Sequence, residues 1–204
     1  MSTSRTVRVG VGVLAAASIL TACSSHTTTG TPSTTPPGTS SATNSPSASA
    51  PKVPAALPTA AILSDPCQAL SATQADTIGL LTVSKPLNLA GAPGCRWTSQ
   101  TSSVNSVDVS PLPENKNGLG DLYTNNDAHK YELFEPTTID GYPAAYAELK
   151  NLRSTGLCTL WVAVTDQLTV MVEPQIGDGV NKTNPCPIAA KVGAAMIEHL
   201  KGAA

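Results

Sequence analysis

The side chains best suited to chemistry in this sequence are five cysteines and three histidines. No two cysteines form a C-x-x-C pair, and neither His129 nor His199 stands at ligand spacing to a cysteine, so no metal site is predicted. Thiol redox chemistry would also favour a closely spaced pair. We therefore expect structural disulfides among the four cysteines that follow residue 60, which are Cys67, Cys95, Cys158 and Cys186.

The sequence has no serine-hydrolase motif, and no catalytic residue is predicted. A serine hydrolase needs a nucleophile on a strained turn and a histidine base, and no G-x-S-x-G occurs. His26 lies in a Ser/Thr/Pro tract, His129 in a predicted solvated loop and His199 in a terminal helical turn. A carboxylate pair for glycoside hydrolysis stays open, because such residues meet only in space. The chain is thus predicted not to be an enzyme and to use no cofactor.

Residues 1–22 have the three parts of an export signal, with basic residues first, an apolar run next and small residues last. The apolar run 11–20 is shorter than the roughly 20 residues that a membrane-spanning helix needs. Leu-Thr-Ala before Cys23 matches a lipobox, in which the cysteine thiol takes a diacylglycerol before the signal is cut. We expect a signal peptide over 1–22 and lipidation of Cys23. The alternative is an ordinary signal peptide, with Cys23 incidental.

The cysteine count supports lipidation, because the four remaining cysteines then form an even set. Two acyl chains give stable anchoring where one is marginal. We therefore expect the mature protein at the extracytoplasmic face of the cell membrane, held by its lipid. Without Arg5 and Arg8 the 12 basic residues fall to 10, against 14 acidic ones, which gives a formal charge of −4. This balance argues against nucleic acid as a partner.

A disordered linker is predicted over 23–58, after the lipidated cysteine. From Ser24 to Pro58, 23 of 35 residues are Ser, Thr or Pro, and Lys52 is the single charge. Such a segment cannot bury enough apolar surface to offset its ordering entropy. A single globular domain is expected over 59–204.

The domain is predicted to be α+β, with an antiparallel sheet of about five strands packed against N-terminal and C-terminal helices. Asp65 before Pro66 and Asn184 before Pro185 indicate helix starts with side-chain caps. Ser71-Ala-Thr-Gln is a capping-box pattern that starts another short helix. Residues alternate with a period of two in five predicted strands, at 95–97, 107–109, 144–149, 158–165 and 168–173. The region 118–135 is expected to be a loop with a short helix.

Three pairings of the four domain cysteines are open. We prefer Cys67 with Cys95 and Cys158 with Cys186, because each bridge then ties a helix start to its own neighbouring strand. Trp97 supports this pairing, since it shares a strand face with Cys95 and can cover the bridge. Chain entropy does not decide the matter. Each sequential loop contributes about 3.6 kcal/mol, and the nested pairing about 1 kcal/mol more per bridge.

Taken together, these short motifs resemble a family of actinobacterial cell-envelope lipoproteins that carry the domain of unknown function 3558. The resemblance rests on the order and spacing of Asp65-Pro66-Cys67 with Leu70, Cys95 with Trp97, Gly141-Tyr142-Pro143-Ala144, Cys158, and Asn184-Pro185-Cys186. Asn184 stands where Asp is more usual, and an N-cap tolerates both. The resemblance implies an exported α+β lipoprotein domain, and it brings no agreed activity, cofactor or site residue.

The predicted function is a non-catalytic interaction module of the cell envelope, whose partner is an unidentified envelope protein or cell-wall ligand. The alternative is a carrier that holds an apolar ligand or lipid between the sheet and the helices. A hydrolase is the third alternative.

Overall fold

The computed structural model describes residues 49–89 and 91–203. The predicted signal peptide, the lipidation site Cys23 and the linker as far as residue 48 lie outside this part. None of the helices in the described part has the length and hydropathy that crossing a bilayer requires. The elements, in chain order, are α1 (Ala60–Ser64), η1 (Pro66–Ala69), α2 (Ala72–Thr77), β1 (Lys85–Leu89), β2 (Ala92–Thr98), β3 (Asn105–Leu112), α3 (Leu119–Asp127), β4 (Leu133–Ile139), β5 (Tyr142–Glu148), η2 (Arg153–Thr155), β6 (Leu160–Thr165), β7 (Leu168–Ile176) and α4 (Cys186–Gly202).

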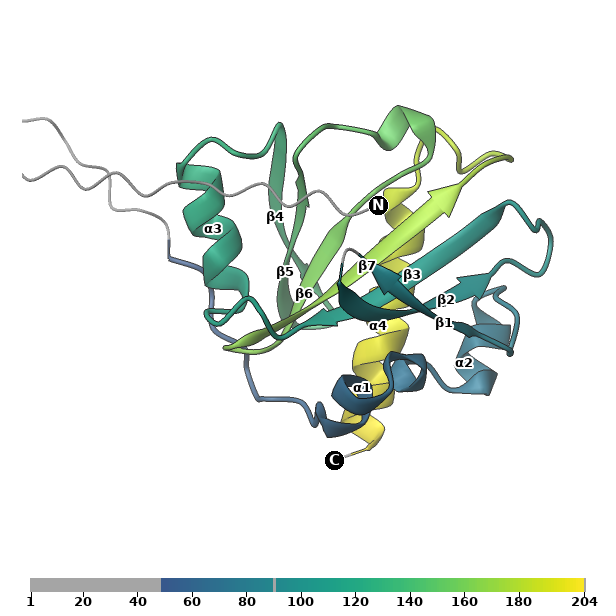
Figure 1. Ribbon diagram of the computed structural model, residues 1–204, viewed down its shortest axis with the longest axis horizontal. Coiled ribbons are helices and arrows are strands. Elements are labelled where there is room, and N and C mark those ends of the chain that lie inside the picture. Colours follow the sequence, from purple (N-terminus) through teal and green to yellow (C-terminus); the bar gives the residue numbers. More distant parts are fainter. Residues whose placement is uncertain (1–48, 90, 204) are drawn as a thin grey trace, which may run out of the picture. The chain divides into compact units, whose positions relative to one another are not determined.

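The strands form one antiparallel sheet of seven, in the order β1-β2-β3-β7-β6-β5-β4 (Figure 1). This confirms the predicted α+β class and the antiparallel sheet, whereas the predicted number of about five strands is too low. The two strands that the sequence did not reveal, β1 and β4, are the edges of the sheet. No residue of β1 is buried, and β4 is buried only at its two ends. Edge strands that bury so little carry no clear period-two pattern.

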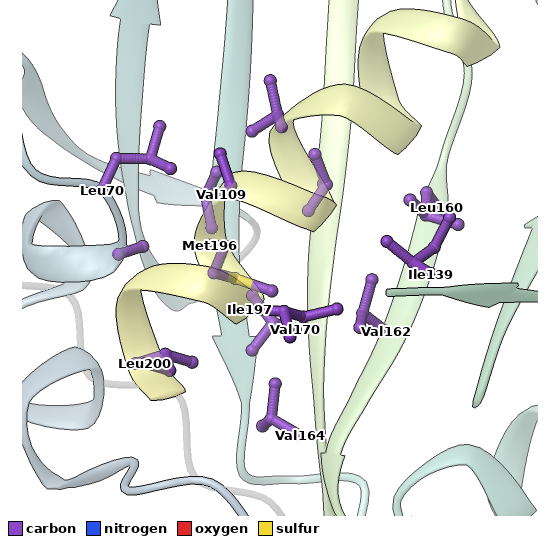
Figure 2. Close-up of a cluster of buried hydrophobic side chains, with 14 of the residues drawn as sticks. Leu70, Val109, Ile139, Leu160, Val162, Val164, Val170, Met196, Ile197 and Leu200 are labelled. Carbon is purple, nitrogen blue, oxygen red and sulfur yellow. The ribbon is translucent and has the colours of Figure 1, made fainter. Parts of the chain in front are cut away.

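Helix α4 lies across one face of the sheet, here called the inner face (Figure 1). Alternate residues of the central strands point to this face and meet the apolar side of α4, because successive strand side chains point to opposite faces. Figure 2 shows the α4 residues Met196, Ile197 and Leu200 among valines of β3, β6 and β7. All three helix residues are at most 2% exposed. The space between α4 and the sheet is therefore filled by the protein's own side chains.

Helix α3 covers part of the opposite face, here called the outer face. Leu119 and Leu122 of this helix are buried against three alanines of β5 and β6, Ala145, Ala147 and Ala163. The small side chains allow the helix to lie close to the strands. Strands β2, β3 and β7 lie beyond this cluster of buried residues.

Two of the three predicted helix starts are correct in position and capped by side chains, and the third is placed one residue too early. The Oδ1 atom of Asp65 accepts the backbone N–H of Cys67 at 3.0 Å, although the helix that follows is a 3₁₀ helix of four residues. Ser71 and Gln74 form the predicted capping box. The predicted cap by Asn184 is wrong. At α4 the N-cap position is occupied by the following proline, which has helical backbone angles and no side-chain acceptor.

Two disulfides connect the helical segments to the sheet. Cys67 of η1 is bonded to Cys95 of β2, and Cys158, just before β6, is bonded to Cys186, the first residue of α4. The Cα atoms are 5.0 and 5.3 Å apart. This confirms the sequential pairing. Trp97 is 1% exposed in the same inner-face core as Cys95, as the shared strand face predicted.

The packed domain begins earlier than the predicted boundary at residue 59. Leu57 is only 6% exposed, and its N–H donates to the carbonyl of Val164 at 2.9 Å. Further upstream, the N–H of Val53 donates to Asp166 Oδ1 at 3.1 Å, and this bond lowers the pKa of the Asp166 carboxyl. The amino-acid composition of residues 53–57 did not reveal this segment, because one buried leucine and a few hydrogen bonds are enough to attach an extended segment to a folded sheet.

Removing the Cys67–Cys95 bridge by the double change Cys67→Ala and Cys95→Ala should lower the free energy of unfolding by about 3.6 kcal/mol, because the unfolded chain regains the entropy of the closed loop. Urea denaturation measures this change. Val83→Ala, at a residue that is 75% exposed, is the control and should leave stability nearly unchanged. An unfolding free energy equal to that of the wild type would contradict the prediction.

Candidate binding site

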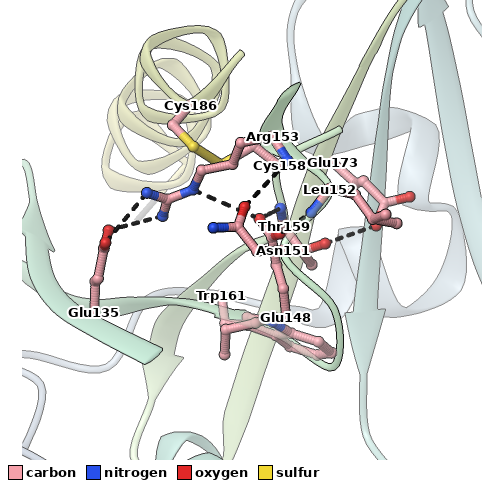
Figure 3. The surroundings of a disulfide bond; sticks show 11 residues. Glu135, Glu148, Asn151, Leu152, Arg153, Cys158, Thr159, Trp161, Glu173 and Cys186 are labelled. Atoms are coloured by element: carbon pink, nitrogen blue, oxygen red, sulfur yellow. Dashed lines mark hydrogen bonds and ion pairs between the residues drawn. A yellow bond between two sulfur atoms is a disulfide. The ribbon is translucent and has the colours of Figure 1, made fainter. Parts of the chain in front are cut away.

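The Cys158–Cys186 disulfide lies beside a buried carboxylate, that of Glu148 at the end of β5 (Figure 3). Glu148 is 6% exposed. Its Oε1 accepts the backbone N–H of Thr159 at 3.2 Å, and its Oε2 accepts that of Leu152 at 3.1 Å. Charge-assisted bonds of this kind compensate the cost of burying a carboxylate. Glu148 thereby holds the loop between β5 and β6 against the end of the sheet.

One group of described residues has the composition of a metal site, because ligand atoms of Glu148, Cys158 and Cys186 lie within 4.8 Å of one another. Both sulfur atoms are bonded in the disulfide. Metal binding by cysteine requires thiolates, so this group cannot hold an ion while the bridge is intact. The arrangement is structural.

Two further contacts fix the β5–β6 loop. The guanidinium of Arg153 donates to both oxygens of Glu135 at 2.7 and 3.2 Å and lies 5.2 Å from the centre of the Tyr146 ring. Gly156 has φ +99, and a Cβ at this position would lie 2.0 Å from the carbonyl oxygen of Ile176. The chain therefore needs glycine where the loop approaches β7. Figure 3 shows Arg153 between Glu135 and Glu148.

A row of polar side chains crosses the outer face of β2, β3 and β7. Arg96 donates through Nε and Nη2 to the two oxygens of Asp108, both at 2.6 Å, and Asp108 is fully buried. This hydrogen bonding raises the pKa of Arg96. The Nε2 group of Gln175 also donates to Asp108, at 2.8 Å. The carboxylate of Asp108 is thus fully engaged inside the protein.

A pocket of about 440 Å³ lies on the outer face next to this row, and we call it the outer-face pocket. Trp161 of β6 and Met171 and Glu173 of β7 line it from the sheet, and Leu149 and Leu152 line it from the β5–β6 loop. The two leucines are 68% and 39% exposed. Exposed apolar side chains gathered around a hollow are typical of binding surfaces.

Two ionisable groups that line the outer-face pocket have a raised pKa, the phenol of Tyr131, which burial raises, and the carboxyl of Glu173. Burial raises the pKa of the Glu173 carboxyl, and the nearby carboxylates of Asp108 and Glu148 raise it further. The hydroxyl of Thr159 donates to Glu173 Oε2 at 2.8 Å and partly offsets these effects. Burial and neighbouring like charges both disfavour an ionised carboxyl.

The outer-face pocket was not predicted from the sequence. Asp108, Glu148 and Glu173 are 25 or more residues apart along the chain and meet only because β3, β5 and β7 lie in one sheet. A weak signal did exist, since Glu173 is a charged residue within a Val-rich strand. His129 and His199 do not line this pocket.

A larger hollow of about 600 Å³ lies between the inner-face end of α4 and two turns that contain Ser102 and Asn181. It is lined mainly by turn residues, and its ionisable side chains, Asp178 and Lys191, form no ion pair with one another. The outer-face pocket is the better candidate, because it joins an aromatic ring, exposed leucines and a perturbed carboxyl.

Comparison with known proteins gives one match. The family described as "Protein of unknown function (DUF3558)" matches residues 18–199. No curated protein and no solved structure matches the chain.

Replacing Glu173 by Gln should change how stability depends on pH. The folded pKa lies above the ordinary value of 4.5, so the folded protein binds more protons than the unfolded chain between the two values. Wild-type stability should therefore fall, relative to that of Glu173→Gln, as pH rises through this range. Urea unfolding at a series of pH values measures the difference. Parallel curves for the two proteins would show that Glu173 is not perturbed.

Proposed function

The chain belongs to the DUF3558 family, and we propose that it is an extracytoplasmic lipoprotein that binds a partner through the outer-face pocket. The description of the family names no function, so the proposal draws on the residues of this chain. It has two parts, the anchor and the binding surface.

The anchor is supported by the N-terminal sequence and by the cysteine count. Residues 1–22 have the composition of an export signal, and Leu-Thr-Ala leads into Cys23. The two disulfides use four of the five cysteines, which leaves Cys23 as the odd one. Disulfides are also typical of compartments outside the cytosol. We propose that Cys23 carries the lipid and holds the protein at the outer side of the cell membrane.

The binding role is carried by one observation, the outer-face pocket with Leu149 and Leu152 exposed at its rim. An apolar group of a partner would cover these leucines and the ring of Trp161. Hydrogen bonds support a non-catalytic role, because the oxygens of Asp108 and Glu148 are held by Arg96 and by backbone N–H groups. These two carboxylates serve the fold.

The carrier alternative is favoured by the size of the pocket. A volume of about 440 Å³ is within the range of small-molecule sites, roughly 300–1,000 Å³. A small apolar ligand could occupy the outer-face pocket without a protein partner. The layer between the sheet and α4 gives no support to a lipid held there, since Met196 and Ile197 fill it.

Replacing Cys23 by Ser should release the protein from membranes into detergent-free supernatant, because serine cannot accept the thioether-linked lipid. Immunoblots of the membrane and soluble fractions, with the mass of the mature N-terminus, measure the effect. Val83→Ser is the matched control, since it introduces a serine at an exposed position of the folded domain and should leave the membrane fraction unchanged. Unaltered membrane retention and mass in Cys23→Ser would exclude the anchor.

A photo-crosslinking residue at position 149 should capture the partner in intact cells, because this side chain is exposed at the rim of the outer-face pocket. The same residue at position 83, which is also exposed, is the control. A protein adduct specific to position 149 supports the interaction module, and a lipid or small-molecule adduct supports the carrier. Equal labelling at both positions would contradict a binding role for the pocket.

A further inference from the structure

We propose that the outer-face pocket binds an arginine side chain of a partner protein, with Glu173 as the acceptor of its charge and Trp161 as the surface on which its guanidinium group lies. This inference rests on the proposed binding function and names the chemistry of the partner. Four observations lead to it, concerning charge, ring surface, apolar rim and the protein's own cations.

The first observation is a carboxylate that lines the pocket without an ion pair, although the side chains of Thr159 and Gln175 hydrogen-bond to it. Glu173 takes part in none of the ion pairs formed by the described residues. Arg96 of β2, with β3 between it and the strand of Glu173, attracts this carboxylate but is bonded through two nitrogens to Asp108. The carboxylates of Asp108 and Glu148 act on Glu173 in the same direction as burial and raise its pKa. A guest cation would relieve both the repulsion and the cost of burial.

The second observation is the orientation of Trp161. Its indole N–H donates to the carbonyl oxygen of Ala147 at 3.0 Å, so the polar edge of the ring is already satisfied. The ring lines the pocket beside Met171, its partner in the β6–β7 ladder. What remains for a guest is carbon surface and the π face. A guanidinium stacks on aromatic faces and also pairs with carboxylates through parallel N–H groups, whereas an ammonium is a compact point charge.

The third observation is the apolar rim. Leu149 and Leu152 are exposed where the pocket meets solvent. An arginine side chain has three methylene groups before its charged end, and such stems pack on apolar surface. Leucine, aromatic ring and carboxylate in one pocket match the apolar stem, the planar group and the charge of an arginine side chain.

The fourth observation concerns the cations of this protein near the pocket. Arg153 forms ion pairs with Glu135 and Glu148 and lies over the Tyr146 ring. Lys150 lines the rim, is exposed, and is in none of the ion pairs of the described residues. Neither cation forms an ion pair with Glu173, so an ion pair with its carboxylate is open to a group from outside the chain.

The test uses two short peptides that differ only in charge, acetyl-Leu-Arg-amide and acetyl-Leu-citrulline-amide, titrated calorimetrically into the full-length protein in detergent. Citrulline has the shape of arginine without the charge. The arginine peptide should bind at least about tenfold more tightly to the wild type, since a hydrogen-bonded charge pair of this kind is worth about one factor of ten or more. Glu173→Gln should remove the difference, and Glu114→Gln, an exposed glutamate outside the pocket, should keep it.

The outcomes separate this inference from the proposed function. Equal binding of both peptides to the wild type overturns charge recognition and leaves a binding pocket. A preference for arginine that survives in Glu173→Gln overturns the role of Glu173. Binding of neither peptide overturns the arginine proposal, while the crosslinking from position 149 still decides the binding function. The circular dichroism spectrum of Glu173→Gln should equal that of the wild type. This result would show that the lost preference for the arginine peptide is not caused by unfolding.

Discussion

The contact between α4 and the inner face of the sheet is the interaction on which the rest of this domain depends. A seven-stranded sheet must bury at least one face, and within residues 49–89 and 91–203 only α4 is long enough to cross it. The chain is poor in aromatic side chains, so aliphatic residues such as Met196 and Val170 supply most of the burial. The disulfides act at the margins of this layer. One fixes the first residue of α4, and the other attaches η1 to β2.

The outer face is covered by no helix as long as α4 in the part of the chain that the structure describes. The short helix α3 covers the alanines of β5 and β6, and the extended segment that contains Val53 packs beside them. Over β2, β3 and β7 the residues are polar and satisfy one another, as Arg96 and Asp108 do. The outer-face pocket lies between the apolar region under α3 and this polar row. It exists because neither the apolar cover nor the polar row extends over Trp161 and Glu173.

The β5–β6 loop gives this gap a definite shape. A loop of this length would be mobile if only its ends were attached, and a mobile wall makes a poor binding site. Here Glu148 accepts two of its backbone N–H groups, and Gly156 lets it approach β7 closely. The buried carboxylate therefore links the stability of the domain to the form of the pocket. This link supports the proposed function, because it holds Leu149 and Leu152 in place without a partner.

The sequence by itself determined the features that depend on neighbours along the chain. The Asp65 cap, the Ser71–Gln74 capping box and the β6–β7 hairpin follow from local hydrogen bonding and from periodicity, so they could be predicted. Cysteine parity and the position of Trp97 also led to the correct disulfides. Only the tertiary structure decided the edge strands, the docking of residues 53–57 and the meeting of Asp108, Glu148 and Glu173. The reason is physical, since the order of strands in a sheet sets which distant side chains become neighbours, and that order follows from the energy of the whole packed domain.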